Sequence, residues 1–325
     1  MHNLTSLSRR AFLRGAAASA AAASLAQPFH SCLGAPGPAH WVTAIRDTHL
    51  KLTGEPTCWQ ALDRLGISGI EMLLNDQLVC TCLYHPDKSY RVASSDDCQA
   101  VQDELARHNV TITALCMSNR LDENLEREVG WVRQVAEAAE RLKVRAIRID
   151  VVPHSLPAGQ FLPFAIKACR QLCETIKDKP VRLGIENHGQ FTNNPEFLEQ
   201  LFDGVHSDQL GLTLDVMNFY WFGHPLDDVY NLCQKFASRV VHTHCKNLNY
   251  PADQRNVRRP VGWEYERYAA PLDEGDINYK KVTSILRQAN YGGDLCLENE
   301  CLGRFPKDQH VPILKRELAA LRALS

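Results

Sequence analysis

The sequence predicts an α/β fold consisting of a single (β/α)8 barrel, and three observations support this. Short apolar segments alternate with amphipathic segments along residues 40–325, as in a parallel sheet covered by helices. There are eight such apolar segments, which is the number of strands that closes this kind of barrel. The chain has 325 residues, and one barrel of about 250 residues with loop insertions accounts for this length without a second domain.

The expected strands are short segments rich in aliphatic residues. They are Trp41–Ile45, Gly69–Leu74, Thr111–Met117, Val144–Val152, Val181–Glu186, Leu210–Asp215, Val240–His244 and Asp294–Glu298. The expected helices are Pro56–Leu65, Asp97–His108, Asn124–Leu142, Phe161–Ile176, Pro195–Phe202, Leu226–Phe236, Tyr279–Ala289 and Pro312–Leu324. Residues 76–98 and 247–276 show neither pattern, so we expect a long loop in the first region and a polar, aromatic insertion in the second.

Residues 1–26 have the pattern of a twin-arginine export signal. Arg9 and Arg10 precede an alanine-rich segment, and small residues at its end suit a cleavage site. Residues 27–39 are then a linker before the barrel at residues 40–325. The pattern predicts export, and therefore a periplasmic or secreted protein.

Charge and composition argue against two kinds of partner. The formal net charge is −2 at pH 7, and removing residues 1–26 changes it to about −5, because that segment contains three arginines and no acidic residue. Nucleic acid binding needs concentrated positive charge, so no nucleic acid partner is expected. Beyond the signal there is no stretch of about 18 apolar residues, so no membrane span is expected.

Twelve cysteines are many for an exported protein. Twin-arginine substrates fold before they cross the membrane, so buried thiols can form in a reducing cytoplasm. Cys116, Cys245 and Cys296 lie within expected strands and are interpreted as core thiols. Cys80 and Cys82 lack a second matching pair and give only weak support for a zinc site.

Four of the expected strands end on residue types that bind metal ions: Glu186, Asp215, His244 and Glu298. The first two intervals are 29 residues each, which matches one βα unit, and the third, of 54 residues, contains the insertion. At the carboxyl ends of barrel strands these side chains would meet across one mouth. Three carboxylates and one imidazole favour Mn²⁺, Mg²⁺ or Co²⁺, with Zn²⁺ as an alternative. The competing interpretation is that the acids pair with arginines at the loop starts.

The same region resembles a known family. The sequences GIENHG, LTLDVMN, HTHCKN and GDLCLENE are similar, in order and spacing, to strands five to eight of the xylose isomerase-like TIM barrels. This group of sugar and sugar-phosphate isomerases and epimerases includes tagatose epimerase. The segment PLDEGDINYKKVTSILRQANYGGDLCLE resembles the last βα unit of the family. The resemblance covers most of residues 40–325 and is closest over residues 181–300.

The resemblance implies that Glu186, Asp215, His244 and Glu298 bind one divalent ion. It also implies that Glu186 and Glu298 act as acid and base on opposite faces of a sugar. An ion that holds two neighbouring sugar oxygens would polarise a carbonyl and stabilise an enediolate, so that isomerisation or epimerisation follows when the proton returns.

Three alternative functions remain open. A lyase or dehydratase would use the same enediolate to expel a substituent. An endonuclease like the DNA-repair members of the superfamily would need more metal-binding histidines and a basic face. A carbohydrate-binding protein without catalytic activity would not need the intact ligand set.

Five further residues are expected to contact the substrate: His188, Asn218, Lys246, Glu71 and His154. His188 follows Glu186 by two positions and therefore lies on the same side of the strand. Asn218 stands where some relatives carry a histidine. Lys246 would hold a substrate oxygen or the developing negative charge, and its alternative is a solvated lysine.

The remaining assignments have alternatives of their own. Glu71 would reach the substrate from the second strand, or else form a structural salt bridge. His154 lies near the predicted mouth, as does Asp150. His242 suits the barrel interior, and the choice of Glu298 over Glu300 depends on the resemblance.

The expected partner is a small carbohydrate, and a homo-oligomer is possible. Export argues against a phosphorylated cytosolic intermediate, so a free sugar, a keto-sugar or a glycoside is preferred. The four aromatic residues at 219–222 follow Asp215 directly and would form an apolar wall against a sugar ring, or else pack a loop or a subunit interface.

Overall fold

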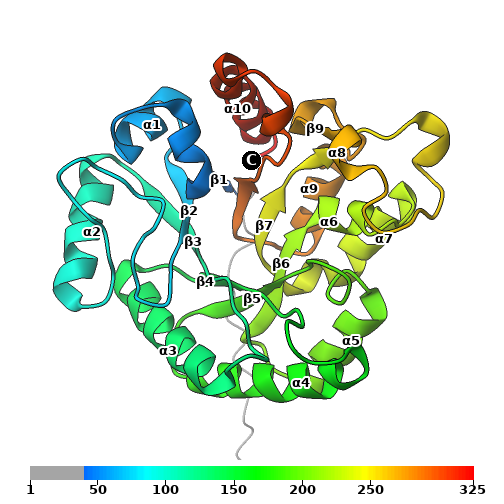
Figure 1. Cartoon of the computed structure of the whole chain (residues 1–325), viewed down its shortest axis with the longest axis horizontal. Helices are drawn as coiled ribbons and strands as arrows, with labels where there is room; N and C mark the ends of the chain where they lie inside the picture. The colour runs from blue at the N-terminus through cyan, green and yellow to red at the C-terminus, as the bar shows by residue number, and fades with distance from the viewer. Residues whose placement is uncertain (1–39) are drawn as a thin grey trace, which may run out of the picture. The chain divides into compact units, whose positions relative to one another are not determined.

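The computed structural model describes residues 40–325, and they form the expected closed barrel (Figure 1). Its strands are β1 (Val42–Arg46), β2 (Gly69–Leu73), β3 (Thr111–Cys116), β4 (Ala146–Ile149), β5 (Arg182–Glu186), β6 (Leu210–Asp215), β7 (Val240–Cys245) and β10 (Asp294–Leu297). They follow the order β1-β10-β7-β6-β5-β4-β3-β2, and every neighbouring pair is parallel. The predicted export signal at 1–26 and linker at 27–39 lie outside the described residues.

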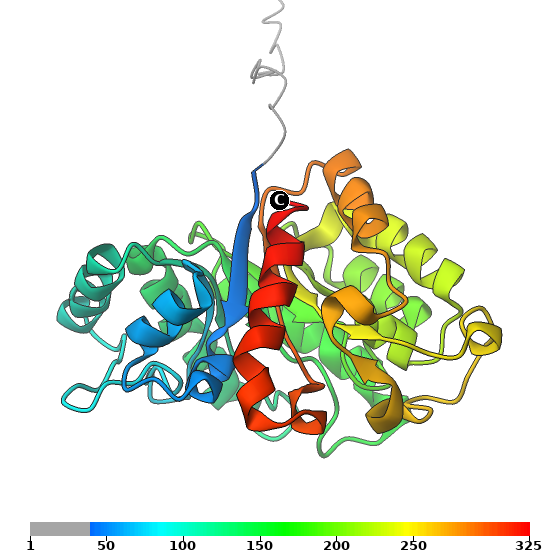
Figure 2. The ribbon, with the colours of Figure 1, turned by 90° about the horizontal axis from the view of Figure 1, so that it is seen from above.

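Helices surround the barrel on its outer side (Figures 1 and 2). They are α1 (Cys58–Leu65), α2 (Ser95–Arg107), α3 (Leu125–Leu142), α4 (Ala158–Thr175), α5 (Pro195–Val205), α7 (Leu226–Phe236), α9 (Tyr279–Gln288) and α10 (Lys307–Arg322). Figure 2 shows α10 beside β1, so the last helix packs against the first strand. Among the helices of residues 40–325, none has the length and apolar composition that a membrane crossing requires.

Local sequence sets several helix starts. Ser94 and Asp97 form a capping box at the start of α2. The side chain of Asn124 accepts a hydrogen bond from a backbone N–H in the first turn of α3, and Asn194 does the same for α5, whose first residue is Pro195. These caps satisfy N–H groups that have no partner within the helix.

Several predicted boundaries differ from the structure by one to five residues, and two of the differences have a clear physical reason. β4 ends at Ile149 and does not continue to Val152, because Val151 is buried outside the sheet, so its apolar character reflects packing and not strand pairing. α10 begins at Lys307, which places Pro312 inside the helix. Proline is favoured in the first turn of a helix, but the first turn here is polar and carries no apolar periodicity from which it could be recognised.

The insertion at 247–276 contains short elements that the sequence did not reveal. They are β8 (Asn247–Leu248), α8 (Tyr265–Tyr268) and β9 (Ala269–Ala270), and β8 pairs with β9 in an antiparallel ribbon. A further short helix, α6 (Val216–Trp221), follows β6 directly. The insertion is therefore an ordered part of the barrel's rim.

One buried arginine fixes the insertion against α6. Arg259 is 5% exposed, and its guanidinium lies 4.5 Å from the ring centre of Tyr220 and 4.4 Å from that of Tyr250. It also donates to the backbone carbonyls of Tyr220 and His224 at 3.1 and 3.0 Å. Because a buried guanidinium needs both a partner for its charge and acceptors for its N–H groups, this arrangement stabilises the local packing.

The cysteines of residues 40–325 are all free thiols. Cys116, Cys245 and Cys296 are at most 1% exposed, so the prediction that they are core thiols is confirmed. Cys80 and Cys82 belong to none of the groups of potential metal ligands found in this part of the chain. The structure therefore gives no support to a zinc site there.

Replacing Gly184 by alanine should destabilise the barrel. A β-carbon at this position of β5 would lie 2.5 Å from Thr213 Oγ1 and 2.7 Å from a methyl group of Val241. Relieving such contacts requires neighbouring strands to move, which costs about 1–3 kcal/mol of unfolding free energy. Urea denaturation measures this difference.

Gly130→Ala is the matched control, because it adds the same methyl group within α3, where nothing lies within 4 Å of the new β-carbon. Removing a glycine from a helix interior should raise the unfolding free energy by roughly 0.5–1 kcal/mol. A Gly184→Ala protein as stable as the Gly130→Ala protein would contradict this account of barrel packing.

Candidate metal centre

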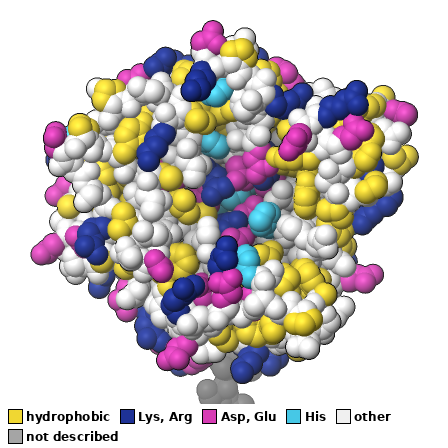
Figure 3. Space-filling view, in the orientation of Figure 1, with side chains coloured by type: hydrophobic (Ala, Val, Ile, Leu, Met, Phe, Trp, Pro, Cys, Tyr) yellow, Lys and Arg dark blue, Asp and Glu magenta, His cyan; other side chains and the backbone are white. Residues whose placement is uncertain are grey.

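The four side chains at the predicted strand ends converge at one mouth of the barrel. One ligand atom from each of Glu186, Asp215, His244 and Glu298 lies within 4.8 Å of those of the other three. All four residues are buried, with at most 5% of their surface exposed. Figure 3 shows this mouth, where acidic, basic and histidine side chains gather at the centre of the face. The predicted convergence is confirmed.

One nitrogen of this cluster is a candidate ligand for a bound cation. His244 Nδ1 is buried and has no hydrogen-bond partner among residues 40–325, whereas Asp215 Oδ2 lies 2.9 Å from the ammonium of Lys246. His244 Nδ1 lies 3.4 Å from Glu186 Oε1 and 3.2 Å from Glu298 Oε2. Buried polar atoms without partners are costly, and three carboxylates with one imidazole suit a divalent cation.

Glu71 on β2 contacts His244 through the ring nitrogen that does not face the cluster. Both Glu71 oxygens lie 3.1 Å from His244 Nε2, and Arg46 Nε lies 2.9 Å from the same carboxylate. When His244 donates its Nε2 proton to Glu71, the lone pair of Nδ1 points into the cluster, which is how carboxylates orient metal-binding histidines. The structure therefore shows the salt-bridge alternative for Glu71, whose carboxylate pairs with Arg46 and contacts His244.

Two arginines that sequence reasoning missed hold the two central glutamates. Arg148 on β4 donates to Glu186 Oε2 from Nε at 2.6 Å and to Asp150 Oδ2 from a terminal nitrogen at 2.7 Å. Arg46 on β1 donates to Glu298 Oε1. The pairing of acids with arginines, weighed as the competing interpretation, is therefore present together with the cluster. The available signals were Arg148 inside the expected strand Val144–Val152 and Arg46 directly after the expected strand Trp41–Ile45.

Each glutamate is thus held through one oxygen while the other faces the cluster. Burial alone raises the pKa of both carboxyls. The cations Arg148 and His244 lower the pKa of Glu186 below its usual range, and Lys246 and His244 do the same for the pKa of Glu298. Both side chains are therefore carboxylates, the state required of a metal ligand or a base.

Lys246 follows β7 and enters the cluster from the side. Its Nζ lies 2.9 Å from Asp215 Oδ2, 2.9 Å from Glu298 Oε2 and 2.8 Å from Glu300 Oε1. Burial lowers the pKa of Lys246, but these carboxylates raise it above its usual value, so the side chain is an ammonium. At 4% exposure it is not the solvated lysine of the alternative interpretation.

A pocket of about 230 Å³ opens beside the cluster and is lined by His188, Asn218, Trp221, Tyr265 and Glu300. Asn218 donates to Glu186 Oε1 at 3.1 Å. His188 Nδ1 lies 3.6 Å from Asp150 Oδ1, and this carboxylate raises the pKa of His188. The structure therefore places His188 and Asn218 between the cluster and solvent, where a substrate would contact them.

Tyr265 also lines this pocket, although no sequence pattern pointed to it. It lies on α8 in the insertion, and its hydroxyl donates to Glu300. Glu300 remains outside the cluster and Glu298 lies inside it, as the resemblance implied. His242 is fully buried and lies 2.8 Å from Asp294, which agrees with its place in the barrel interior.

The structure does not bring His154 to the pocket. It is exposed in the loop after β4, and its backbone N–H donates to the carboxylate of Asp122. It is not among the residues that line the pocket. The carboxylate of Asp122 anchors this loop by accepting hydrogen bonds from the backbone N–H groups of residues 154–156, a contact that sequence spacing alone does not reveal.

The family model of xylose isomerase-like TIM barrels matches residues 59–324. The chain belongs to this family. A curated relative, the uncharacterized protein MJ1311 of Methanocaldococcus jannaschii, is 25% identical over 180 residues, which are 53% of this chain and 56% of that protein. The chain thus spans little more than half the length of that relative.

Solved structures share the fold of this xylose isomerase-like barrel at low identity. The IOLI protein with a bound zinc atom gives a TM-score of 0.63 at 15% identity, over 87% of this chain and 98% of that one. A D-tagatose 3-epimerase-like protein gives a TM-score of 0.60 at 16% sequence identity, over 87% of this chain and 98% of that one. The probable 3-DHS dehydratase AsbF of Bacillus anthracis gives a TM-score of 0.57 at 18% sequence identity, over 86% of this chain and 98% of that one.

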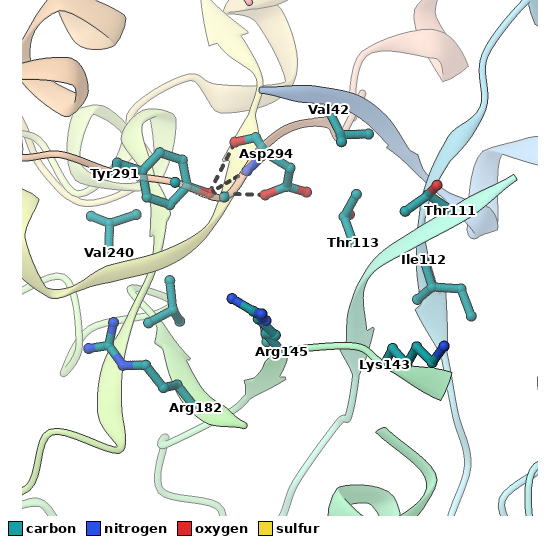
Figure 4. A pocket seen from close by; sticks show the side chains of 14 residues that line it. Val42, Thr111, Ile112, Thr113, Lys143, Arg145, Arg182, Val240, Tyr291 and Asp294 are labelled. Carbon is teal, nitrogen blue, oxygen red and sulfur yellow. Dashed lines mark hydrogen bonds between the residues drawn. The ribbon is translucent and has the colours of Figure 1, made fainter. Parts of the chain in front are cut away.

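A separate pocket of about 300 Å³ lies at the opposite end of this xylose isomerase-like barrel (Figure 4). Its lining includes Val42, Thr111, Arg182 and Asp294, each at the amino end of its strand, and no member of the metal cluster. Figure 4 shows the carboxylate of Asp294 held by the hydroxyl of Tyr291. The four-residue cluster and this pocket are therefore separate features, although Asp294 also lies near His242 and Cys296 in a smaller group of potential metal ligands.

Replacing Glu71 by glutamine should weaken metal binding about 10- to 100-fold, because a neutral amide no longer orients His244. Titration of the metal-free protein with Mn²⁺, followed by calorimetry, measures the affinity. Glu128→Gln is the matched control, since Glu128 is also 1% exposed but bonds to Asn119 and Arg127. Equal affinity in both variants would show that Glu71 does not support the ligand.

Proposed function

We propose that the protein is a metal-dependent sugar isomerase or epimerase that removes a proton next to a carbonyl group. The observation that carries this proposal is the buried cluster of Glu186, Asp215, His244 and Glu298 beside a pocket large enough for one sugar ring. Family membership and the fold shared with a D-tagatose 3-epimerase-like protein support it.

Glu186, Asp215, His244 and Glu298 would hold the metal, which when bound supplies Lewis-acid polarisation of the substrate carbonyl. The oxygen-rich donor set favours Mn²⁺, Mg²⁺ or Co²⁺. Zinc stays an alternative, as one structure of the same fold contains it. The buried His244 Nδ1, which has no hydrogen-bond partner in the described part of the chain, supports a cation at this site.

The protein's acid and base groups would be the two arginine-held glutamates. Glu186 Oε1 and Glu298 Oε2 lie 3.4 and 3.2 Å from His244 Nδ1. We assign them to opposite faces of the bound sugar, as the family resemblance implies. One takes the proton from the carbon next to the carbonyl, and the electron pair moves onto the carbonyl oxygen. The other returns a proton to the opposite face or to the neighbouring carbon.

The charge that forms on the substrate oxygen needs nearby donors. Lys246 is a buried ammonium in contact with Glu298, and His188 lies at the pocket wall with a raised pKa. Fixed cations at the position where negative charge develops stabilise the transition state more than the ground state. We assign Lys246 and His188 to this task and Asn218 to positioning Glu186.

A lyase or dehydratase is the second candidate, and the position of Lys246 favours it specifically. An ammonium 2.9 Å from Glu298 can protonate an oxygen that leaves from the carbon beyond the enediolate. The fold is also shared with a probable 3-DHS dehydratase. Release of water or an alcohol, seen by product analysis, would select this reaction over epimerisation.

Glu298→Gln should lower kcat by about 10²–10⁴, because the amide cannot exchange a proton with the substrate. The measurement is incorporation of solvent deuterium into ketohexoses and 3-keto-glucosides by the Mn²⁺-loaded enzyme. Glu300→Gln changes the neighbouring carboxylate outside the cluster and should cause a smaller loss. A larger loss of kcat in Glu300→Gln than in Glu298→Gln would instead assign the acid or base role to Glu300.

Removal of the metal with a chelator should abolish this exchange, and added Mn²⁺ should restore it. A chelated enzyme that still exchanges deuterium would exclude the proposed metal-dependent reaction. Absence of exchange with the loaded wild-type protein on every sugar tested would count against the isomerase, the epimerase and the lyase together.

We also propose that the protein is exported by the twin-arginine pathway, on the pattern of residues 1–26 alone. In a bacterial host with this pathway, the full chain should appear in the periplasm or medium without its first residues. Replacing Arg9 and Arg10 together by lysine should retain it in the cytoplasm. Equal export of both forms, assayed by fractionation and mass spectrometry, would disprove this route.

A further inference from the structure

The substrate pocket continues outward into a second space. The inner pocket, of about 230 Å³, is the one lined by His188, Asn218, Trp221, Tyr265 and Glu300. The outer groove, of about 710 Å³, is lined by Trp221, Gly262, Glu264, Tyr265, Glu266 and Arg267. Trp221 and Tyr265 line both, so the two spaces adjoin at these two rings.

The volumes indicate that a single sugar does not occupy both spaces. Pockets that bind small molecules usually hold about 300–1,000 Å³, and the inner pocket is below this range. It therefore suits one ring beside the cluster. The outer groove is three times larger and is bounded by the insertion, which places a separate binding surface next to the reacting group.

The two shared aromatic rings are held in place by specific contacts. The backbone carbonyl of Trp221 accepts a hydrogen bond from the N–H of Gly262 at 2.9 Å. Gly262 has a φ of +69°, and a β-carbon there would lie 3.2 Å from Trp221 Nε1, so the turn packs closely on the indole. Tyr265 is fixed through its hydroxyl by Glu300. Both rings are partly exposed, as expected for surfaces that stack on a ligand.

The charges around the groove argue against a phosphate group. Arg259 is buried between Tyr220 and Tyr250 and is satisfied by backbone carbonyls, so it does not reach a ligand. Arg258 lies 2.7 Å from the Nδ1 atom of His224. Of the groove's own residues, Arg267 pairs with Glu264 at 3.0 Å. The groove therefore lacks a free group of cations among the described residues and suits an uncharged ring.

We propose that the substrate is a keto-glycoside whose oxidised sugar ring lies in the inner pocket and whose uncharged second ring lies in the outer groove against Trp221 and Tyr265. This inference rests on the proposed function. A glycosidic bond removes the carbonyl character of the anomeric carbon, so the carbonyl must be a ketone elsewhere on the ring. The proton from the carbon beside the ketone passes to a glutamate, and its electron pair moves to the ketone oxygen.

This assignment also places the enzyme in a reaction sequence. An unmodified glycoside has no carbonyl next to an acidic C–H bond, so a dehydrogenase must first oxidise one ring hydroxyl to a ketone. The keto-glycoside then reaches this enzyme with its second ring still attached. The isomerase, epimerase and lyase reactions all begin with the same proton removal, so the two-part substrate is compatible with each.

The test compares a one-ring and a two-ring probe. Solvent deuterium incorporation is measured for methyl 3-keto-β-D-glucopyranoside and for p-nitrophenyl 3-keto-β-D-glucopyranoside with the Mn²⁺-loaded enzyme. Burying one aromatic ring contributes about 1.5–3 kcal/mol, so kcat/KM should be at least about tenfold higher for the p-nitrophenyl compound. Trp221→Ala should reduce the ratio of the two kcat/KM values by a similar factor.

Phe222→Ala is the matched control. Phe222 is the next residue in the chain and is also partly exposed, but it packs against Arg258 and lines neither space. This variant should keep the wild-type ratio. A wild-type ratio near one, or a ratio unchanged by Trp221→Ala, would overturn the two-ring substrate while leaving the proposed reaction intact.

A binding measurement tests the two-part site without requiring turnover. Calorimetry with the unreactive methyl and p-nitrophenyl β-D-glucopyranosides should show tighter binding of the p-nitrophenyl compound to the wild-type protein and loss of this preference in Trp221→Ala. Preference without deuterium exchange would support the two-part site and contradict the proposed reaction. Equal binding of both compounds would contradict the two-part site.

Discussion

The arrangement at the barrel mouth depends on balancing buried negative charge. Glu71, Glu186, Asp215 and Glu298 are at most 5% exposed and lie close together. Burying one carboxylate without a partner costs several kcal/mol, and neighbouring carboxylates also repel one another. Three cations pair with these carboxylates: Arg46 from β1, Arg148 from β4 and Lys246 from the end of β7. A divalent cation would complete this balance.

The same balance explains why the central side chains are well oriented. Arg148 and Arg46 each bind one oxygen of a glutamate, which turns the other oxygen toward the cluster. Glu71 directs His244 by accepting its Nε2 proton. Side chains oriented by such hydrogen bonds and ion pairs keep their geometry without the metal or substrate, so little reorganisation is needed when either binds.

The barrel strands position the metal-ligand cluster, and the insertion forms part of the wall of the adjoining pocket. Parallel strands in a closed sheet bring all their carboxyl ends to one rim, so residues 29 or 54 positions apart meet there. The insertion at 247–276 then adds a wall, which Arg259 fixes against α6 and from which Tyr265 reaches the pocket. Reaction chemistry and substrate recognition are thus carried by different parts of the chain, which is common in this fold.

The sequence alone determined the eight-stranded barrel and the four residues of the cluster, because strand periodicity and the residue that ends each strand are local properties. It also placed His188, Asn218 and Lys246 near the mouth through their spacing from those ends. Tertiary structure decided what each charged group contacts. The partner of Glu298 is Arg46, 252 residues away, and β1 reaches β10 only because the sheet closes. The salt bridge of Glu71 to Arg46 also crosses between strands, and the loop of His154 is held by Asp122, 32 residues earlier. Contacts of this kind depend on distances across the closed barrel, which no local pattern encodes.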